Sequence, residues 1–527
     1  MKISLAQLNY TIGDIDGNKS KIIESVERAK ACGADLAVFA EQALSGTPAF
    51  DLLRKSTFLE LCEDALEEIA GHCDGIAAIV GLPLLTEQGT VSAAALIENG
   101  RVVRYVGKRH ITARREMGFL VSGSGPEYAE VAGHKIAIIV GDDLSRACDF
   151  DKSAETVISV NARRYGKGML SYRYELMQRL SFVEGKNMVL VNQVGGATEI
   201  VYDGTSGAFN SRGELTLMMK SFEEDFAVYD TEAGNPPVDM TYTSYNDRTR
   251  MLFEAACLGL RDYFHKNGYR KASIGLSGGI DSAVVACIAV KALGRENVRA
   301  LLMPSQFSSD HSVGDAKEVA ERLGIKYDIL HITSIYETTL KTLEPVTGGT
   351  EFDATEENIQ SRIRTILLMA LQNKTGYVVL NCSNKSENAL GMCTLYGDTA
   401  GAFSVTGDLY KSEVYDVARY INRTYGNPIP ERVLDKEPSS ELHPDQKDSD
   451  ILPPYEVVDA ILYRMIEEGQ HREEIINAGF DSEVVEKIHS MIMHNEKKRY
   501  QFPPVLRLSA CAFGHERLMP LTNKYGD

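Results

Sequence analysis

The second half of the chain alternates short apolar runs with segments of helical periodicity, and this pattern constrains the fold most. After an amphipathic stretch that begins at Arg248 come, in order, SIGL, AVVACIAVKAL, VRALLMP, DAKEVAERLG and KYDILHI. Short apolar runs suit buried strands, whereas apolar residues spaced three and four apart suit one face of a helix. Such alternation is typical of parallel strands connected by helical crossovers. We therefore predict a doubly wound α/β domain whose ligands bind at the carboxyl ends of its strands.

The first half also alternates strand and helix patterns, from KISLAQLN through GIAAIVGLPLL and HKIAIIVGDD to NMVLVNQVGG. It ends in AVYDTEAGNPPVDMTYTSYND, a polar stretch with a Pro-Pro pair and little periodicity, which is typical of a linker. A chain of 527 residues is too long for one ordinary core. We expect two domains, residues 1–240 and 241–527, with the boundary near Thr241.

The composition argues against several classes of protein. Apolar residues make up 44% of the chain and charged residues 25%, as in globular proteins. The net charge of −18 disfavours a nucleic-acid partner, because phosphate binding relies on clustered Lys and Arg. The nine cysteines form no CxxC pair, the N-terminal segment has no apolar signal-like region, and no stretch is long enough to span a membrane. We expect a cytoplasmic protein with reduced cysteines and a small substrate.

The loop Ser277-Gly278-Gly279-Ile280-Asp281-Ser282 connects an apolar strand to an apolar helix. A helix N-terminus and successive backbone N–H groups form an anion site in such a position. The two glycines allow the main chain to approach a phosphate closely, the serine hydroxyls can donate hydrogen bonds, and Asp281 can hold Mg²⁺. No Walker lysine follows the loop. The pattern predicts a phosphate site, and its alternative is a glycine-rich turn without a ligand.

SGGIDS resembles the pyrophosphate loop of the N-type ATP pyrophosphatases, which adenylate a carbonyl or carboxyl oxygen and release pyrophosphate. Because that family is broad, the loop alone leaves the substrate open. The later segments ATEENIQSRIRTILLMALQN, NKSENALGMCTLYGD, GDLYKSEVY, EPSSELHPDQKDSD and NEKKRYQFPP resemble NAD synthetases over nearly all of residues 245–527. This resemblance implies an adenine nucleotide alpha hydrolase-like fold and a ligase that adenylates deamido-NAD with ATP. Ammonia then attacks, giving NAD, AMP and pyrophosphate.

The resemblance also implies which residues act. Asp281, Glu387 and Lys411 would be catalytic, and the two acids would hold Mg²⁺ on the ATP phosphates. ATP contacts are expected from Ser277, Gly278, Gly279, Ile280, Asp281, Ser282, Met303, Thr394, Lys411 and Ser439. Deamido-NAD contacts are expected from Arg362, Arg364, Asp398, Lys497 and Lys498. Taken singly, each charged side chain also fits a solvated position on a helix.

The first 240 residues resemble the nitrilase-like glutamine amidase domain that is fused to some NAD synthetases, which implies an α-β-β-α sandwich. FAEQALSGTPAFDLL places the catalytic Glu of that family at Glu41, and YVGKRHIT places its catalytic Lys at Lys108. Relatives continue with C-E-D-x-W, whereas this chain reads G-D-D-L-S from Gly141 onward. Because glycine cannot form a thioester, the resemblance implies an amidase domain without its nucleophile, in which Glu41 and Lys108 remain as an ion pair or as surface charges.

Three functions stay open at this point. The chain is an NAD synthetase that uses free ammonia or ammonia from a separate glutaminase, a glutamine-hydrolysing NAD synthetase, or a non-catalytic nucleotide-binding scaffold. The second function needs another nucleophile near Gly141, such as Ser145 or Cys148. The resemblance further implies a homo-oligomer, at least a dimer.

Overall fold

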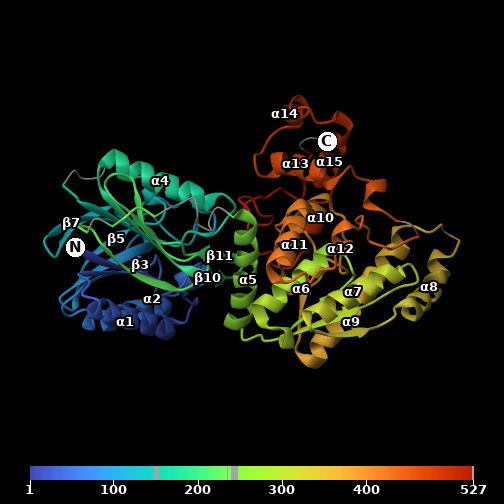
Figure 1. The fold of residues 1–527 in the computed structure, drawn as a ribbon, viewed down its shortest axis with the longest axis horizontal. Coiled ribbons are helices and arrows are strands. Elements are labelled where there is room, and N and C mark those ends of the chain that lie inside the picture. Colours follow the sequence, from blue (N-terminus) through green and yellow to red (C-terminus); the bar gives the residue numbers. More distant parts are fainter. Residues whose placement is uncertain (147–152, 234, 239–246, 350, 445, 525–527) are drawn as a thin grey trace. The chain divides into compact units, whose positions relative to one another are not determined.

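The computed structural model describes residues 1–146, 153–233, 235–238, 247–349, 351–444 and 446–524 (Figure 1). The chain divides into two units, Met1–Asn246 and Asp247–Asp527. The boundary that we expected near Thr241 lies outside the described residues. Each unit has its own sheets and its own buried clusters, so each is described by itself.

Two six-stranded sheets form the centre of the N-terminal unit. Their strand orders are β14-β1-β2-β3-β4-β5 and β13-β12-β9-β8-β7-β6, and β10 and β11 form a separate pair. The strands are β1 (Lys2–Gln7), β2 (Leu36–Val38), β3 (Ala77–Thr86), β4 (Gly89–Glu98), β5 (Arg101–Gly107), β6 (Glu127–Val131), β7 (His134–Val140), β8 (Thr156–Asn161), β9 (Asn187–Asn192), β10 (Val194–Ala197), β11 (Ile200–Asp203), β12 (Gly207–Phe209), β13 (Leu215–Met218) and β14 (Asp225–Asp230).

The two six-stranded sheets pack face to face, with helices outside them (Figure 1). Alternate residues of a strand point to the same face of its sheet. Ile3 of β1 and Ile138 of β7 both point to the space between the two sheets, where they belong to one buried cluster. Ala6 points to the other face and meets α1 (Ile15–Ala31) and α2 (Ser56–Gly71). The second sheet is covered by α4 (Met169–Glu184), and α3 (Asp143–Arg146) follows β7. The α-β-β-α sandwich predicted from the sequence is confirmed.

The C-terminal unit contains a parallel sheet of five strands in the order β17-β16-β15-β18-β19. The strands are β15 (Ala272–Gly275), β16 (Val298–Leu302), β17 (Lys326–Ile329), β18 (Val378–Asn381) and β19 (Phe403–Ser404). From β15 the chain first adds strands on one side and later returns to add β18 on the other side. The strand order therefore reverses between β15 and β18, and ligands of such sheets bind at the carboxyl ends of the strands at that point.

Helices surround this sheet, and a group of them forms a separate apolar cluster near the C-terminus (Figure 1). In α9, Ile363 packs with Leu301 of β16 and Val379 of β18, whereas Val458 of α13 packs with Leu390 of α10. The helices are α5 (Arg248–Lys266), α6 (Ile280–Leu293), α7 (Asp310–Leu323), α8 (Thr333–Thr347), α9 (Ala354–Thr375), α10 (Lys385–Leu390), α11 (Lys411–Tyr425), α12 (Glu431–Asp435), α13 (Tyr455–Ile466), α14 (Arg472–Asn477), α15 (Ser482–His494) and α16 (Glu496–Arg499). The parallel-sheet fold predicted for this half is confirmed.

Candidate active site

The glycine-rich loop leads from β15 into α6 at the point where the strand order reverses. Gly278 has φ +84°, and a Cβ built on it would lie 2.2 Å from the main-chain oxygen of Ser312 in α7, so only glycine fits. Ser277 Oγ accepts the N–H of Gly279 at 3.2 Å and lies 3.1 Å from Ser282 Oγ. The hydrogen bonds close the turn on itself at the carboxyl end of β15, and Gly278 lets it approach α7 closely.

Asp281, Glu387 and Lys411 meet beside this loop. Lys411 Nζ lies 2.6 Å from Asp281 Oδ2 and 3.5 Å from Glu387 Oε1. Asn384 Nδ2 donates to Asp281 Oδ1 at 2.8 Å. Asp281 lies in the first turn of α6, Glu387 in the first turn of α10, and Lys411 begins α11. The helices α6 and α10 follow β15 and β18, so the neighbouring ends of these two strands bring the acids together.

The electrostatics of this centre show a shortage of positive charge. Burial, and then the charge of Asp281, raise the pKa of Glu387 to about 8, although Lys411 acts in the opposite direction. Burial disfavours the charged form of Lys411, but Asp281 and Glu387 together raise the pKa of this lysine above its usual value. A site of this kind gains from a further cation.

These groups border a cavity of about 320 Å³ at the carboxyl ends of β15, β16 and β18. The cavity is also bordered by α9 and by residues 436–442. The predicted site residues that line it are Ser277, Gly279, Ile280, Asp281, Ser282, Met303, Arg364, Glu387, Asp398, Lys411 and Ser439.

Five of the predicted site residues, all within the described ranges, do not line the cavity: Gly278, Arg362, Thr394, Lys497 and Lys498. Thr394 is buried, and its N–H donates to Asp398 Oδ1 at 2.6 Å, so it orients a lining carboxylate. Lys498 Nζ donates to two main-chain carbonyls at 2.6 and 2.9 Å. Arg362 and Lys497 are exposed, and Arg362 Nε donates to a main-chain carbonyl at 3.2 Å. Gly278 and Thr394 therefore adjoin lining residues, whereas the cavity wall does not include the three cations Arg362, Lys497 and Lys498.

Arg364 and Asp398 supply a cation and an anion to the cavity wall. Arg364 Nε donates to the main-chain oxygen of Met303 at 3.0 Å, which fixes the guanidinium along α9. Asp398 is open to the cavity, but the protein that encloses the cavity desolvates its carboxyl group and raises its pKa to about 6. The N–H of Thr394 acts in the opposite direction, because it favours the charged form.

Asn384, Lys436 and Glu441 are among the polar lining or bordering residues that sequence reasoning missed. Glu441 Oε1 accepts the hydroxyl of Ser312 at 2.6 Å and lies 3.2 Å from Lys436 Nζ, and Lys436 also donates to Ser312 Oγ. These contacts tie residues 436–441 to the N-terminus of α7. The only signal in the sequence was position: Lys436 and Glu441 flank Ser439, and Asn384 precedes the segment that contains Glu387.

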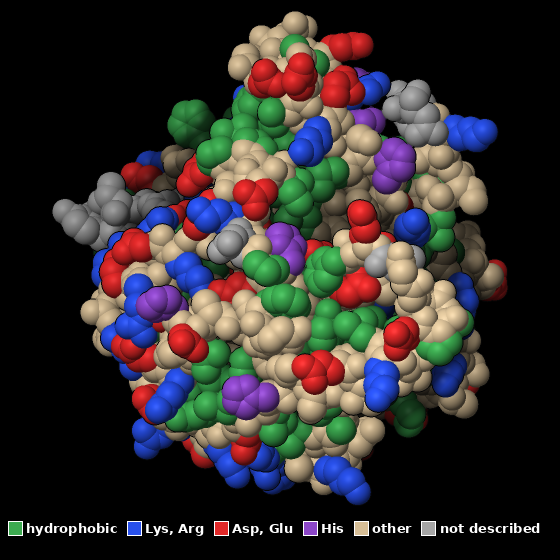
Figure 2. Space-filling model, turned by 90° about the vertical axis from the view of Figure 1, so that its right-hand side faces the viewer, with side chains coloured by type: hydrophobic (Ala, Val, Ile, Leu, Met, Phe, Trp, Pro, Cys, Tyr) green, Lys and Arg blue, Asp and Glu red, His purple; other side chains and the backbone are tan. Residues whose placement is uncertain are grey.

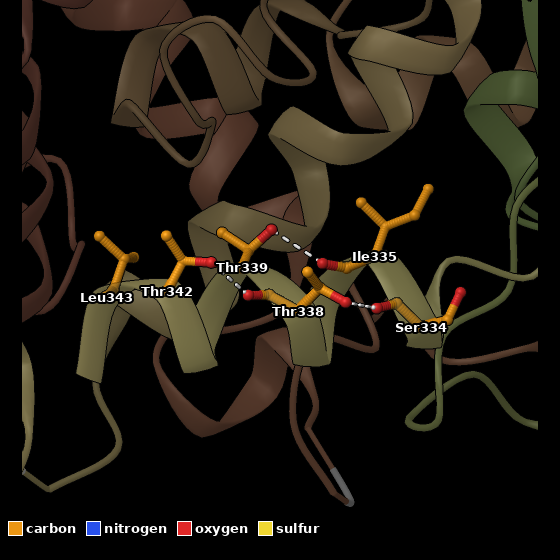
Figure 3. Close-up of a pocket in the computed structure, with 6 residues that line it drawn as sticks. All are labelled: Ser334, Ile335, Thr338, Thr339, Thr342 and Leu343. Carbon is orange, nitrogen blue, oxygen red and sulfur yellow. Dashed lines mark hydrogen bonds between the residues drawn. The ribbon is translucent and has the colours of Figure 1, made fainter. Parts of the chain in front are cut away.

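A second hollow lies along α8 (Figure 3). The hydroxyls of Thr338, Thr339 and Thr342 donate to carbonyls four residues earlier at 2.7–2.8 Å. The hollow therefore presents mainly methyl and aliphatic groups, and its lining residues carry no charge: Ser334, Ile335, Thr338, Thr339, Thr342 and Leu343. The cavity beside β15 is the better candidate for a nucleotide, because phosphates need donors and cations.

Glu41, Lys108 and Gly141 also meet, in the N-terminal unit. Lys108 Nζ lies 3.2 Å from Glu41 Oε1 and 2.8 Å from Glu116 Oε2, and all three side chains are buried. The pair is therefore a buried ion pair and not a pair of surface charges. Gly141 follows β7 with φ +56°, and a Cβ built on it would lie 2.7 Å from Glu41 Oε2 and 2.9 Å from Lys108 Nζ. A side chain at position 141 would point directly at the pair.

Ser145 and Cys148 are the two residues that the sequence offers as replacement nucleophiles. Ser145 is exposed in α3, and its hydroxyl donates to the main-chain oxygen of Asp142 at 2.7 Å. Cys148 lies outside the described residues. Glu116, the third member of the buried charge cluster, was missed by sequence reasoning.

In the described ranges, no group of three or more His, Cys, Asp and Glu side chains could hold a metal ion. The pair Asp281 and Glu387 nevertheless fits Mg²⁺, which usually takes one or two protein carboxylates and completes its shell with substrate phosphates and water.

No described helix is long and apolar enough to cross a membrane. On the face in Figure 2, described Lys and Arg side chains are interspersed with Asp and Glu.

Comparison with known families matches each unit separately. Residues 2–233 match the carbon-nitrogen hydrolase family, and residues 252–502 match the NAD synthase family. Over the full length, the chain is 38% identical to the glutamine-dependent NAD(+) synthetases of Aquifex aeolicus and of Acinetobacter baylyi. The alignments cover 100% of both chains in the first case, and 99% of this chain and 98% of the relative in the second.

Solved structures give the same picture. A glutamine-dependent NAD+ synthetase from Acinetobacter baumannii, in complex with adenosine diphosphate, is 35% identical, with a TM-score of 0.76 over 99% of this chain and 98% of that one. A glutamine-dependent NAD(+) synthetase from Cytophaga hutchinsonii has a TM-score of 0.85 over 99% and 98% of the two chains. Its identity is 20%, so this second likeness shows the fold alone.

Proposed function

The chain belongs to the glutamine-dependent NAD(+) synthetase family, and from this premise we propose that its C-terminal unit makes NAD from deamido-NAD, ATP and free ammonia. It is a ligase with a carbon-nitrogen hydrolase unit and an ATP-using NAD synthase unit, as the sequence predicted. The observation that carries the proposal is the meeting of Asp281, Glu387 and Lys411 beside the glycine-rich loop.

In this proposal the loop from Ser277 to Ser282 binds the ATP phosphates through main-chain N–H groups and hydroxyls. Asp281 and Glu387 hold Mg²⁺, and Lys411 contacts the phosphates. The support is the chemistry of the donor set, since two half-buried carboxylates share one ammonium and one of them, Glu387, has a pKa of about 8. When bound, Mg²⁺ neutralises charge on the phosphate oxygens and on departing pyrophosphate.

The reaction needs activation because the nicotinate carboxylate is a poor electrophile. A carboxylate oxygen attacks the α-phosphorus of ATP, pyrophosphate leaves, and the carboxylate carries AMP. Ammonia then attacks the acyl carbon, AMP leaves, and the nitrogen loses its extra proton to give the amide. The protein contributes positioning and charge neutralisation, which suits a cavity lined by cations, acids and hydroxyls and needs no protein nucleophile.

Arg364 and Asp398 are the lining residues that we assign to deamido-NAD. The guanidinium suits a phosphate or carboxylate oxygen, and the carboxyl group suits a hydroxyl or amino donor. Thr394 acts through Asp398, because its N–H donates to that carboxyl group. Arg362, Lys497 and Lys498 lie outside the cavity wall, and we assign them to the outer part of the substrate.

We further propose that the N-terminal unit does not hydrolyse glutamine. Its support is Gly141, which stands where a nucleophile would face Glu41 and Lys108 and which has no group that can attack an amide. The ammonia then comes from solution or from a separate glutaminase. Assembly as a homo-oligomer is a further proposal, and the mass of the particle in solution tests it.

The test is a side-by-side assay with ammonium and with glutamine as the nitrogen donor, following AMP and NAD. We expect AMP and NAD with ammonium, and no product above background with glutamine. Equal rates with both donors would overturn the loss of glutamine hydrolysis. ATP binding without product from either donor would favour a nucleotide-binding scaffold and overturn the synthetase proposal.

A further inference from the structure

Asp459 in α13 is a buried carboxylate that reaches the residues next to Glu387 and Lys411. Its exposed fraction is 5%, and the described lining of the cavity does not include it. Asp459 Oδ1 accepts the hydroxyl of Ser386 at 2.5 Å, and Oδ2 accepts the N–H of Ser412 at 2.8 Å. Ser386 directly precedes Glu387, and Ser412 directly follows Lys411. One carboxylate therefore cross-links the first turns of α10 and α11.

Ser386 makes the link between the two helices tighter. Its Oγ accepts the N–H of Lys411 at 2.9 Å while its hydroxyl proton goes to Asp459. The Ser386 side chain is fully buried, so water does not replace these bonds without a change in packing. The main chain at Lys411 and at Ser412 is thus attached to α10 and α13 at two successive N–H groups.

Asp459 lies on a helix that is packed in a buried apolar cluster. Val458, Ile461 and Leu462 of α13 lie in the same buried cluster as Leu390 of α10. On its other side, α10 is anchored by Lys385, whose Nζ lies 2.8 Å from Asp408 Oδ1 and donates to Ser509 Oγ at 2.7 Å. With both helices packed in this way, the position of the Asp459 carboxylate is determined before any substrate binds.

We propose that Asp459 is a positioning residue for amide formation, which sets the place of Glu387 relative to Lys411 without touching a substrate. The proposal rests on the proposed function of the cavity. The role follows from the short distances at the centre, where Lys411 Nζ lies 2.6 Å from Asp281 Oδ2 and 3.5 Å from Glu387 Oε1. A displacement of about 1 Å at such a site can cost ~100-fold in rate.

The test is Asp459→Asn in the full-length protein, assayed with saturating ammonium and ATP. Asn has the same shape, but its single oxygen can accept from only one of the two donors, and its NH₂ group faces the other. We expect kcat to fall about 10- to 100-fold, because Glu387 and Lys411 shift relative to each other. The KM for deamido-NAD should stay within about twofold, since Arg364 and Asp398 lie on elements outside this link.

A matched control is Asp203→Asn in the N-terminal unit. Asp203 is also a buried aspartate with two donors, Arg173 and Asn192. Its substitution should lower the melting temperature and leave kcat with ammonium within about twofold. An equal loss of kcat in both variants would mean that destabilisation alone lowers activity, which overturns the proposal.

Ser386→Ala is the second variant, and it decides the question if Asp459→Asn does not fold. It removes one hydroxyl and leaves the bond from Ser412 to Asp459, so we expect a fall in kcat at the lower end of that range, about 10-fold, with unchanged KM for deamido-NAD. Folded variants that keep kcat within about twofold of the parent would disprove the positioning role. A parent protein that makes no NAD at all would instead disprove the proposed function.

Discussion

Gly141 lies directly against Glu41, because a Cβ built on the glycine would come within 2.7 Å of Glu41 Oε2. The same Cβ would lie 2.9 Å from Lys108 Nζ. A side chain at position 141 would therefore face the buried pair directly, whereas the glycine found there offers no reactive group.

Gly141→Cys should restore a reactive group at this position. The two close contacts are with the far ends of flexible side chains, which can move by a few tenths of an ångström, and the left-handed backbone costs about 1–2 kcal/mol for a residue with a Cβ. We expect a thiol-reactive glutamine analogue to label residue 141 of the variant, and glutamate release from glutamine to exceed that of the parent about 10-fold or more.

Gly141→Ala is the control for this experiment, since it carries the same backbone strain and no thiol. It should release no more glutamate than the parent. A Gly141→Cys variant that is folded, as judged by its melting curve, but that is neither labelled nor active would contradict the geometry described for Glu41 and Lys108.

Asp281→Asn should lower kcat with ammonium by ~100-fold or more, because it removes a negative charge and a proposed magnesium ligand beside the phosphates. Asp281 is also the closer partner of the buried Lys411 ammonium, with its Oδ2 2.6 Å from Nζ. Its replacement should therefore lower the free energy of unfolding by about 1–3 kcal/mol. Kinetics and denaturant titration measure the two effects. Asp310→Asn, at an exposed position in the first turn of α7, is the control and should change neither.

The pH dependence of stability should carry the signature of Glu387. The folded protein holds the Glu387 proton more tightly than the unfolded chain, because burial and Asp281 raise its pKa from 4.5 to about 8. The stability that this group contributes is therefore full below pH 4.5 and is lost as the pH rises through about 8. The test compares the melting temperatures of Glu387→Gln and the parent, measured with a chelator present and without nucleotide. The variant's melting temperature minus the parent's should increase as the pH rises over this range. A constant difference across it would show that Glu387 titrates normally.

Gly278→Ala should damage both fold and activity. The added Cβ would meet the main-chain oxygen of Ser312 at 2.2 Å, and φ +84° disfavours any residue with a Cβ. We expect a loss of about 2–4 kcal/mol in the free energy of unfolding and a large loss of ATP binding. Gly314→Ala is the matched control: it lies in α7 with nothing within 4 Å of the added Cβ, so it should stabilise the protein by about 0.5–1 kcal/mol. Denaturant titration and ATP binding by calorimetry compare the two.

Sequence patterns were sufficient for the parallel strands of the C-terminal unit and for the backbone conformation of the glycine-rich loop. Alternation of apolar runs with helical periodicity indicates parallel strands with crossovers, and the structure confirms this for β15 to β18. The left-handed backbone at Gly278 admits only glycine, so the residue type by itself indicates this conformation. The lack of a thiol at Gly141 is likewise a property of one residue, and it could be read without any structure.

The contacts between distant residues depended on the tertiary structure. Asp281 and Lys411 are 130 positions apart, and their ion pair forms because the sheet places α6, which follows β15, near α11, which follows β19. Glu116 beside Lys108 and Asp459 beside Ser386 carry no local pattern that distinguishes them from other acids. Local propensity and spacing determine periodicity and backbone conformation, whereas the distance between two side chains depends on how whole elements pack, and that packing is decided by the sum of many contacts.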